Sequence, residues 1–195
     1  VGYAFGDILQ KELGVPVGLV CVSFGGTPIE AWTPEECFTN PKWVAAHKAM
    51  LDLPKSQKHP ERLRIATEYN ANIAPIVNMK ASGVIWYQGC HNTSYSAAWY
   101  GEMLENMIGA WREKFNSPEL PFYVVQIAPH IYYDGINGAL VREGQALAAS
   151  HLDHVEYIST IDLGDRIGDI HPRYKVGVAS RLAAAALGEH YGKDV

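Results

Sequence analysis

Apolar residues recur along the chain in two alternating patterns, which predict strands and helices in turn. Nearly continuous apolar runs, typical of strands buried on both faces, lie at residues 17–22, 82–87, 122–127 and 155–160. Apolar residues spaced three or four apart predict helices over residues 3–13, 61–74, 99–115 and 138–150. We expect Asn137 to cap the last of these helices and Pro172 to open one more. Residues 33–60 show neither pattern and are expected to form an irregular surface excursion.

Strands that alternate with helices and are buried on both faces favour a parallel sheet covered by helices. The fold class predicted from this order is therefore a three-layer α/β/α sandwich. The chain has 195 residues, of which 48% are hydrophobic and 19% charged. This length and composition fit one globular domain spanning residues 1–195.

Charge and hydropathy exclude two classes of partner from the prediction. The net charge is −5 and the basic residues are scattered, whereas nucleic-acid binding requires clustered Lys and Arg. No apolar stretch approaches the roughly 20 residues of a membrane-spanning helix. We therefore expect neither a nucleic-acid partner nor a membrane span.

Cysteine and histidine spacing gives no sign of a disulfide scaffold or a metal site. The three cysteines, Cys21, Cys37 and Cys90, form no CxxC pair. Cys21 lies in an apolar run and is expected to be a small buried residue. No paired histidines at metal-binding spacing occur, and there is no phosphate-binding glycine motif. We predict no metal and no cofactor.

Polar segments follow each of the four predicted strands, at their carboxyl ends. SFGGTPIEAW (residues 23–32) follows the first strand and QGCHN (residues 88–92) the second. Pro129-His130 follows the third strand, and residues 162–171 follow the fourth. Because the carboxyl ends of parallel strands share one edge of a sheet, these segments are expected to meet there.

The residue types in these segments suit acyl transfer to water. Backbone N–H groups of Gly25 and Gly26 and the Asn92 amide could stabilise an oxyanion, although an ordinary glycine turn and a turn-stabilising Asn fit equally. His171 could act as a general base near neutral pH. The carboxylate that orients it could belong to Asp169, with Asp165 and Asp162 as alternatives.

These segments carry a resemblance to a known family. SFGGTPIEAW resembles the SxxGGTPIEAW stretch of the sialate O-acetylesterase family, and GVIWYQGCHN resembles its GVIWYQGExN stretch. The block DLGDRIGDIHPRYKVGVASRLA resembles the C-terminal DIHP-type block of that family, and REGQ (residues 142–145) resembles its REaQ. The resemblance spans nearly the whole chain. Its wider group, the SGNH hydrolases, has a flavodoxin-like fold and uses Ser, Gly, Asn and His without a metal.

The resemblance implies a serine carbohydrate esterase that removes O-acetyl groups from sugars. It implies that Gly26 or Gly25 and Asn92 form the oxyanion hole and that His171 is the base, oriented by an Asp. Gln88, Gly89 and His91 would contact the substrate. Secretion or periplasmic export is expected on the same ground. An acetyl xylan esterase on the same scaffold, or a sugar-binding relative without catalysis, are the alternatives.

Three features depart from the family pattern. No GQSN-like nucleophile block occurs, the usual Glu and Ser after Gln88-Gly89 are Cys90 and His91, and Gly168 stands where a D-x-x-H spacing would place the acid. The chain begins with Val1. We expect an upstream segment to carry the first strand and the nucleophile, between residues 17–22 and 82–87 in the sheet. The chain alone is predicted to be unstable and inactive.

Overall fold

The centre of the molecule is a small parallel sheet. The computed structural model describes residues 1–52, 60–132, 135–164 and 168–194. Its strands, in spatial order, are β1 (Val84–Trp86), β2 (Phe122–Val125) and β3 (Val155–Ile158). Both pairings are parallel, with Ile85 opposite Tyr123 and Tyr123 opposite Glu156. Three of the four predicted strands are confirmed.

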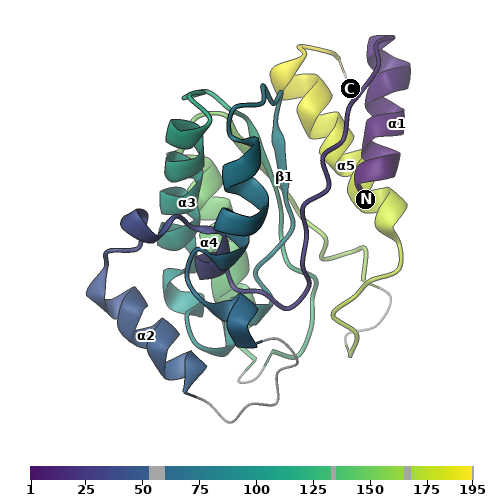
Figure 1. Cartoon of the computed structure of the whole chain (residues 1–195). Helices are drawn as coiled ribbons and strands as arrows, with labels where there is room; N and C mark the ends of the chain where they lie inside the picture. The colour runs from purple at the N-terminus through teal and green to yellow at the C-terminus, as the bar shows by residue number, and fades with distance from the viewer. Residues whose placement is uncertain (53–59, 133–134, 165–167, 195) are drawn as a thin grey trace.

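Helices cover both faces of the sheet (Figure 1). One face carries α3 (Tyr100–Lys114) and α4 (Asn137–His151), and the other carries α1 (Gly2–Leu13) and α5 (Lys175–Ala185). Successive side chains of a strand point to opposite faces. In β2, Phe122 and Val124 accordingly enter the α3–α4 core, whereas Tyr123 and Val125 enter the α1–α5 core. The predicted three-layer α/β/α class is confirmed.

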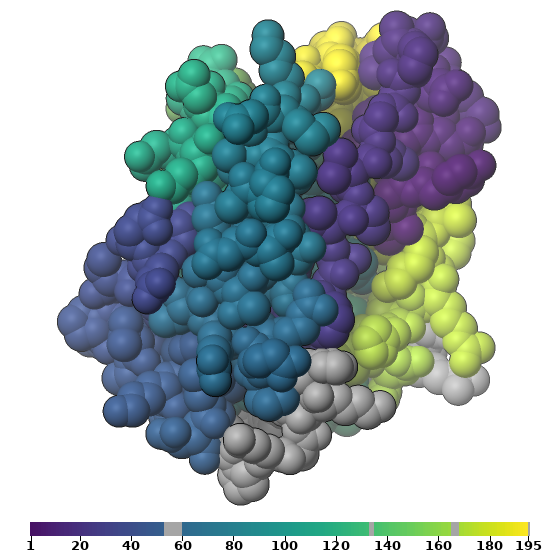
Figure 2. Space-filling model, in the orientation of Figure 1, coloured from purple at the N-terminus to yellow at the C-terminus, as the bar shows by residue number. Residues whose placement is uncertain are grey.

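Residues 17–22 are not the strand that their apolar pattern predicts. Between residues 15 and 23 no backbone hydrogen bond to another described residue forms, and a strand requires a partner for its ladder. Leu19 and Val20 are 49% and 57% exposed, and Cys21 is exposed rather than buried as expected. Figure 2 shows this segment, in dark purple, at the molecular surface.

The segment predicted to be irregular contains a helix. α2 (Pro41–Leu51) begins after Asn40, whose side-chain Oδ1 accepts a hydrogen bond from the Lys42 backbone N–H at 3.0 Å. Proline at the first helical position and an Asn cap are standard start signals, and the sequence prediction missed them. Residues 53–59, the end of the predicted excursion, lie outside the described residues.

The helix predicted over residues 61–74 is broken into short turns. Ala66 has a φ of 60°, which no α-helix accommodates. Its N–H instead donates to the Glu30 carbonyl at 3.0 Å. The 3-10 helices are Ile29–Trp32, Glu35–Cys37, Pro60–Leu63, Ala74–Ile76, His91–Ser94 and Ala97–Trp99, and the π turns are Tyr69–Ile73 and Ala186–His190.

Two predicted helix starts are wrong by a few residues. Asn137 is already inside α4, and its side chain donates to the Thr93 carbonyl at 2.6 Å instead of capping the helix. α5 begins at Lys175, three residues after Pro172. The end of α1 is as predicted, because Gly14 adopts the left-handed conformation and its N–H donates to the Gln10 carbonyl.

Candidate active site

The loop after residues 17–22 turns at a glycine and is closed by polar bonds. Gly26 has a φ of 81°, and the Thr27 hydroxyl donates to the Phe24 carbonyl at 2.8 Å. The same hydroxyl oxygen accepts the Trp32 indole N–H at 2.9 Å. Gly25 and Gly26 are exposed, and a Cβ on either would meet nothing within 4 Å. Open space therefore surrounds the Cα atoms of both glycines on the side where a side chain would stand.

The loop after β1 is tied to this first loop by Gln88. The Gln88 amide donates to the Thr27 carbonyl at 3.0 Å and to Asn92 Oδ1 at 2.9 Å. Its Oε1 accepts the Tyr100 hydroxyl at 2.9 Å. The Gln88 backbone carbonyl accepts from Gln145 on α4 at 3.1 Å. Three residues thus fix the Gln88 side chain, and a fourth holds its backbone.

Asn92 is fully buried and makes hydrogen bonds with both ends of its amide. Its Nδ2 donates to Glu30 Oε2 at 2.8 Å and to the Ser96 hydroxyl at 2.9 Å. Its Oδ1 accepts from the Ile29 backbone N–H at 3.1 Å and from Gln88. Both amide hydrogens are donated inside the protein in this arrangement. The oxyanion role of Asn92 stays a prediction.

Burial shifts the pKa values of the titratable groups around Asn92. Burial raises the pKa of the Glu30 carboxyl, and bonds from its own backbone N–H and from Asn92 oppose the rise. Burial, together with the neighbouring Glu30, holds the pKa of the Tyr95 hydroxyl well above its usual value. Burial lowers the pKa of the His91 imidazole, which is hydrogen-bonded to the Gly26 backbone. These shifts favour a neutral His91 at pH 7.

Cys90 belongs to a second set of neighbouring side chains, which also includes Tyr132, Tyr87 and Lys175. Its thiol is 3.4 Å from the Tyr132 hydroxyl, and burial raises its pKa. Lys175, in the first turn of α5, donates to the Tyr87 hydroxyl at 3.3 Å and lies 4.9 Å from the centre of that ring. Its ammonium group also interacts electrostatically with Cys90 and Asp169. Lys175 therefore connects the Cys90 loop to the C-terminal segment.

The predicted base and its acid lie beside each other on the surface. His171 Nδ1 is 3.7 Å from Asp169 Oδ1, and the His171 backbone N–H donates to the same oxygen at 2.9 Å. The His171 side chain is 85% exposed. Asp162, a rival acid, pairs with Arg181, which lowers its pKa to about 2. The other rival, Asp165, lies outside the described residues.

The structure thus joins the predicted site residues into two groups. The glycine loop, Gln88, His91 and Asn92 form one group linked by hydrogen bonds. His171 and Asp169 form the other, and among the described residues His171 forms no hydrogen bond with a serine hydroxyl. Trp32 is 4% exposed and packs edge-to-face on Trp86, so its ring belongs to the core.

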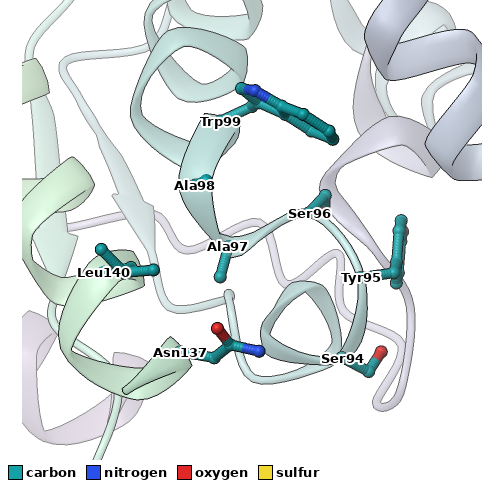
Figure 3. A pocket seen from close by; sticks show the side chains of 8 residues that line it. All are labelled: Ser94, Tyr95, Ser96, Ala97, Ala98, Trp99, Asn137 and Leu140. Atoms are coloured by element: carbon teal, nitrogen blue, oxygen red, sulfur yellow. The ribbon is translucent and has the colours of Figure 1, made fainter. Parts of the chain in front are cut away.

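A cavity of about 290 Å³ lies beside the Asn92 loop. Figure 3 shows Asn137 and Leu140 of α4 on one side of it, and Ser94 and Tyr95 on the other. None of the predicted site residues lines it. Of the residues that bond to Asn92, only Tyr95 and Ser96 line this cavity.

Comparison with known proteins decides the family. The sequence profile described as carbohydrate esterase, sialic acid-specific acetylesterase, matches residues 1–188. The chain belongs to this family. The sialate O-acetylesterase of Homo sapiens is 31% identical over 210 residues, which cover 99% of this chain and 39% of the relative. The sialate O-acetylesterase of Rattus norvegicus is 29% identical, over 99% of this chain and 43% of the relative.

Solved structures agree with this assignment. A carbohydrate acetylesterase from Xanthomonas citri superposes with a TM-score of 0.83 and 32% identity, covering 100% of this chain and 41% of that one. A protein from Arabidopsis thaliana gives 0.64 at 23% identity, covering 96% and 67%, and supports the fold alone. The chain spans about two fifths of the length of its first curated relatives.

The described part of this family member offers neither a cluster of metal ligands nor a membrane-spanning helix. No group of three or more His, Cys, Asp or Glu side chains within these residues is placed to hold a metal ion. Of the described helices, none combines the length and apolar character that crossing a membrane requires.

Sequence reasoning missed several residues that build the site of this acetylesterase-family chain. Glu30 received no role, although a charged residue inside the apolar stretch Pro28-Ile29-Glu30-Ala31-Trp32 is a signal of a buried polar contact. Tyr100 lies in the apolar stripe of a predicted helix and Gln145 in the REGQ stretch, and no local pattern indicates that both bond to Gln88. Their roles depend on tertiary packing alone.

Proposed function

We propose that this protein is a serine carbohydrate esterase that removes O-acetyl groups from sugars, with O-acetylated sialic acid as its substrate. The observation that carries the proposal is the family match over residues 1–188, and the two groups of site residues support it. Both groups consist of residue types that acyl transfer to water requires.

The proposed reaction assigns one role to each group. His171 removes the proton from a serine hydroxyl, which attacks the acetyl carbonyl, and Asp169 orients the imidazole. The Gly25 and Gly26 backbone amides and the Asn92 amide stabilise the tetrahedral oxyanion. The sugar leaves with the proton from His171, and water then hydrolyses the acetyl-enzyme.

The nucleophile is not assigned to a residue of this chain. No segment matches the nucleophile block of the family. Ser23 is exposed, and its hydroxyl lies 3.8 Å from the Cys21 thiol rather than beside an imidazole. The proposal therefore gives the base and the oxyanion donors to this chain and the serine to a preceding segment of a longer protein.

Labelling with a fluorophosphonate tests the proposal directly. The purified chain and a natural protein extended upstream are each treated, and the adduct is located by mass spectrometry. We expect the extended protein to be labelled on a serine outside this chain and to release acetate from O-acetylated sialic acid. Adduct formation on Ser23 or another internal serine would contradict the assignment of the nucleophile.

Substitution of the base adds a second test in the extended protein. His171→Ala is expected to abolish both labelling and acetate release, whereas His190→Ala, also exposed but outside every motif, keeps both. If acetylated xylan is hydrolysed and acetylated sialic acid is not, the substrate proposal is wrong. A protein that binds the sugar but never forms an adduct would be a non-catalytic relative.

We also propose export to the periplasm or the medium, on the family resemblance. Fractionation of cells that express the complete natural protein tests this. Its recovery with cytosolic marker enzymes would contradict export.

A further inference from the structure

Glu30 is a buried carboxylate that the proposed reaction does not use. Its side chain is 0% exposed, and its two oxygens accept from Asn92 Nδ2 at 2.8 Å and from the Tyr95 hydroxyl at 3.0 Å. None of the ion pairs among the described residues involves it. The titratable groups that face it are Tyr95 and, from α2, His47. A buried carboxylate held by neutral donors is costly, which calls for an explanation.

A carboxylate in this position restricts how the Asn92 amide can be oriented. An ionised carboxylate accepts hydrogen bonds and never donates them. The Asn92 amide must therefore turn its Nδ2 toward Glu30, and its Oδ1 then faces the opposite way. The Ile29 backbone N–H is a donor only, so it requires that same oxygen, at 3.1 Å. Two groups of fixed polarity thus exclude the flipped amide.

The orientation of the Asn92 amide in turn determines that of the Gln88 amide. Because Oδ1 points to Gln88, the Gln88 amide nitrogen is held there at 2.9 Å and donates its second hydrogen to the Thr27 carbonyl at 3.0 Å. Its Oε1 is left to accept from the Tyr100 hydroxyl. Glu30 is thus linked through Asn92 and Gln88 to the Thr27 carbonyl, in the loop that carries Gly26.

We propose that Glu30 is a positioning residue, whose ionised carboxylate sets the amide orientation of Asn92 and, through Asn92, that of Gln88. A glutamine of the same shape offers a donor as well as an acceptor, so it removes one of the two constraints on Asn92 and leaves the Ile29 N–H as the other. The inference rests on the proposed function only for the kinetic part of its test.

The structural part of the test uses the side-chain amide signals of Asn92 and Gln88. They are assigned in the ¹⁵N-labelled chain by NMR, and each variant is compared with the wild type. Glu30→Gln is expected to shift both pairs and to speed the solvent exchange of the Asn92 pair by about 10-fold or more. The matched control is Glu68→Gln. Glu68 is also 0% exposed, but it bonds to Arg62 and Asn72 instead of Asn92.

Two results would overturn the proposal. One is a Glu30→Gln spectrum in which the Asn92 and Gln88 pairs keep their wild-type shifts and exchange rates. The other is an equal change of these pairs in Glu68→Gln. Should Glu30→Gln fail to fold, titration of the wild type replaces it. Burial raises the pKa of Glu30, so the Asn92 signals are expected to move with a midpoint above 4.5. Signals that stay constant down to pH 4 in a folded chain contradict the proposal.

The kinetic part uses the extended, active protein. Glu30→Gln is expected to lower kcat about 10-fold with little change of KM, because misplaced site groups reduce turnover by up to about 100-fold. Glu68→Gln keeps kcat. Unchanged kcat in Glu30→Gln, beside a large loss in Asn92→Ala, would refute positioning. An inactive wild type refutes the proposed function and leaves the NMR result to decide on Glu30.

Discussion

A Cβ atom on Gly89 would lie 2.8 Å from Ile127 Cγ2 and 3.0 Å from Val141 Cγ1. Gly89 also has a φ of 142°, a conformation that other residues rarely adopt. The loop between Gln88 and Asn92 therefore lies against Ile127, which follows β2, and against α4, with no room for a side chain at Gly89. The glycine of this motif is explained by packing, independently of any contact with substrate.

We predict that Gly89→Ala destabilises the protein by about 1–3 kcal/mol, the usual range for inserting a carbon atom into a filled core. Urea unfolding measures the change. The matched control is Gly109→Ala in α3, where a Cβ meets nothing within 4 Å. It should stabilise the helix by up to about 1 kcal/mol. Equal stability of Gly89→Ala and wild type would show that the loop moves away freely.

Asn92→Ala is predicted to reduce both activity and stability. Loss of one oxyanion donor lowers kcat by about 10²–10³-fold in related chemistry. The truncation also removes the donor to Glu30 Oε2 and the acceptor for the Ile29 N–H, at about 1–3 kcal/mol for each buried group. The control is Asn106→Ala, which removes a single bond to the Cys37 carbonyl and should keep kcat. Full activity of Asn92→Ala in the extended protein would exclude its catalytic role.

The sequence predicted best those elements whose apolar residues are all buried in the fold. β2 is buried at all four positions, and α3 buries the stripe of apolar residues seen in the sequence. Residues 17–22 have the same apolar pattern but pair with no strand among the described residues, so the pattern alone was insufficient. Between residues 61 and 74, the positive φ of Ala66 breaks the helix, because its N–H bonds to the distant Glu30 carbonyl.

The candidate site was predictable as a set of loops but not as a set of contacts. The rule that loops meet at the carboxyl edge of a parallel sheet correctly brings Gln88 and Asn92 to the glycine loop. No sequence pattern states which way an amide turns. That direction depends on Glu30, 62 residues away from Asn92, and on a backbone N–H. Long-range polar contacts of this kind appear only once the fold is known.

His91 is predicted to make stability depend on pH. Burial lowers its pKa in the folded protein below the value of 6.5 that applies when it is exposed. Below pH 6.5 the unfolded chain therefore binds a proton that the folded chain resists, and the free energy of unfolding falls. The contribution is complete above pH 6.5 and is lost as pH falls through the lowered pKa.

Urea unfolding of wild type and His91→Asn between pH 7.5 and 5 measures this effect. The stability difference between the two proteins should shift in favour of the variant as the pH falls. His154→Asn, at an exposed position, serves as the comparison. A difference that is constant over the whole range would show that His91 is protonated equally in both states.

The exposed segment beside β1 predicts low stability of this chain on its own. Among the described residues β1 pairs with β2 only, and residues 15–23 have no backbone partner. Val15, Leu19 and Val20 are each about half exposed, so apolar area that a paired strand would bury remains in water. A domain of ordinary stability unfolds with about 5–15 kcal/mol.

We expect the 195-residue chain to unfold below that range and to bind a hydrophobic dye such as ANS in its folded form. The double variant Leu19→Thr and Val20→Thr should reduce dye binding. Val176→Thr, at an equally exposed site on α5, should leave it unchanged. Dye binding that is the same in both variants would place the apolar surface elsewhere. A single cooperative transition of normal stability, without dye binding, would contradict the prediction, because it would mean that the open edge of β1 costs the fold nothing measurable.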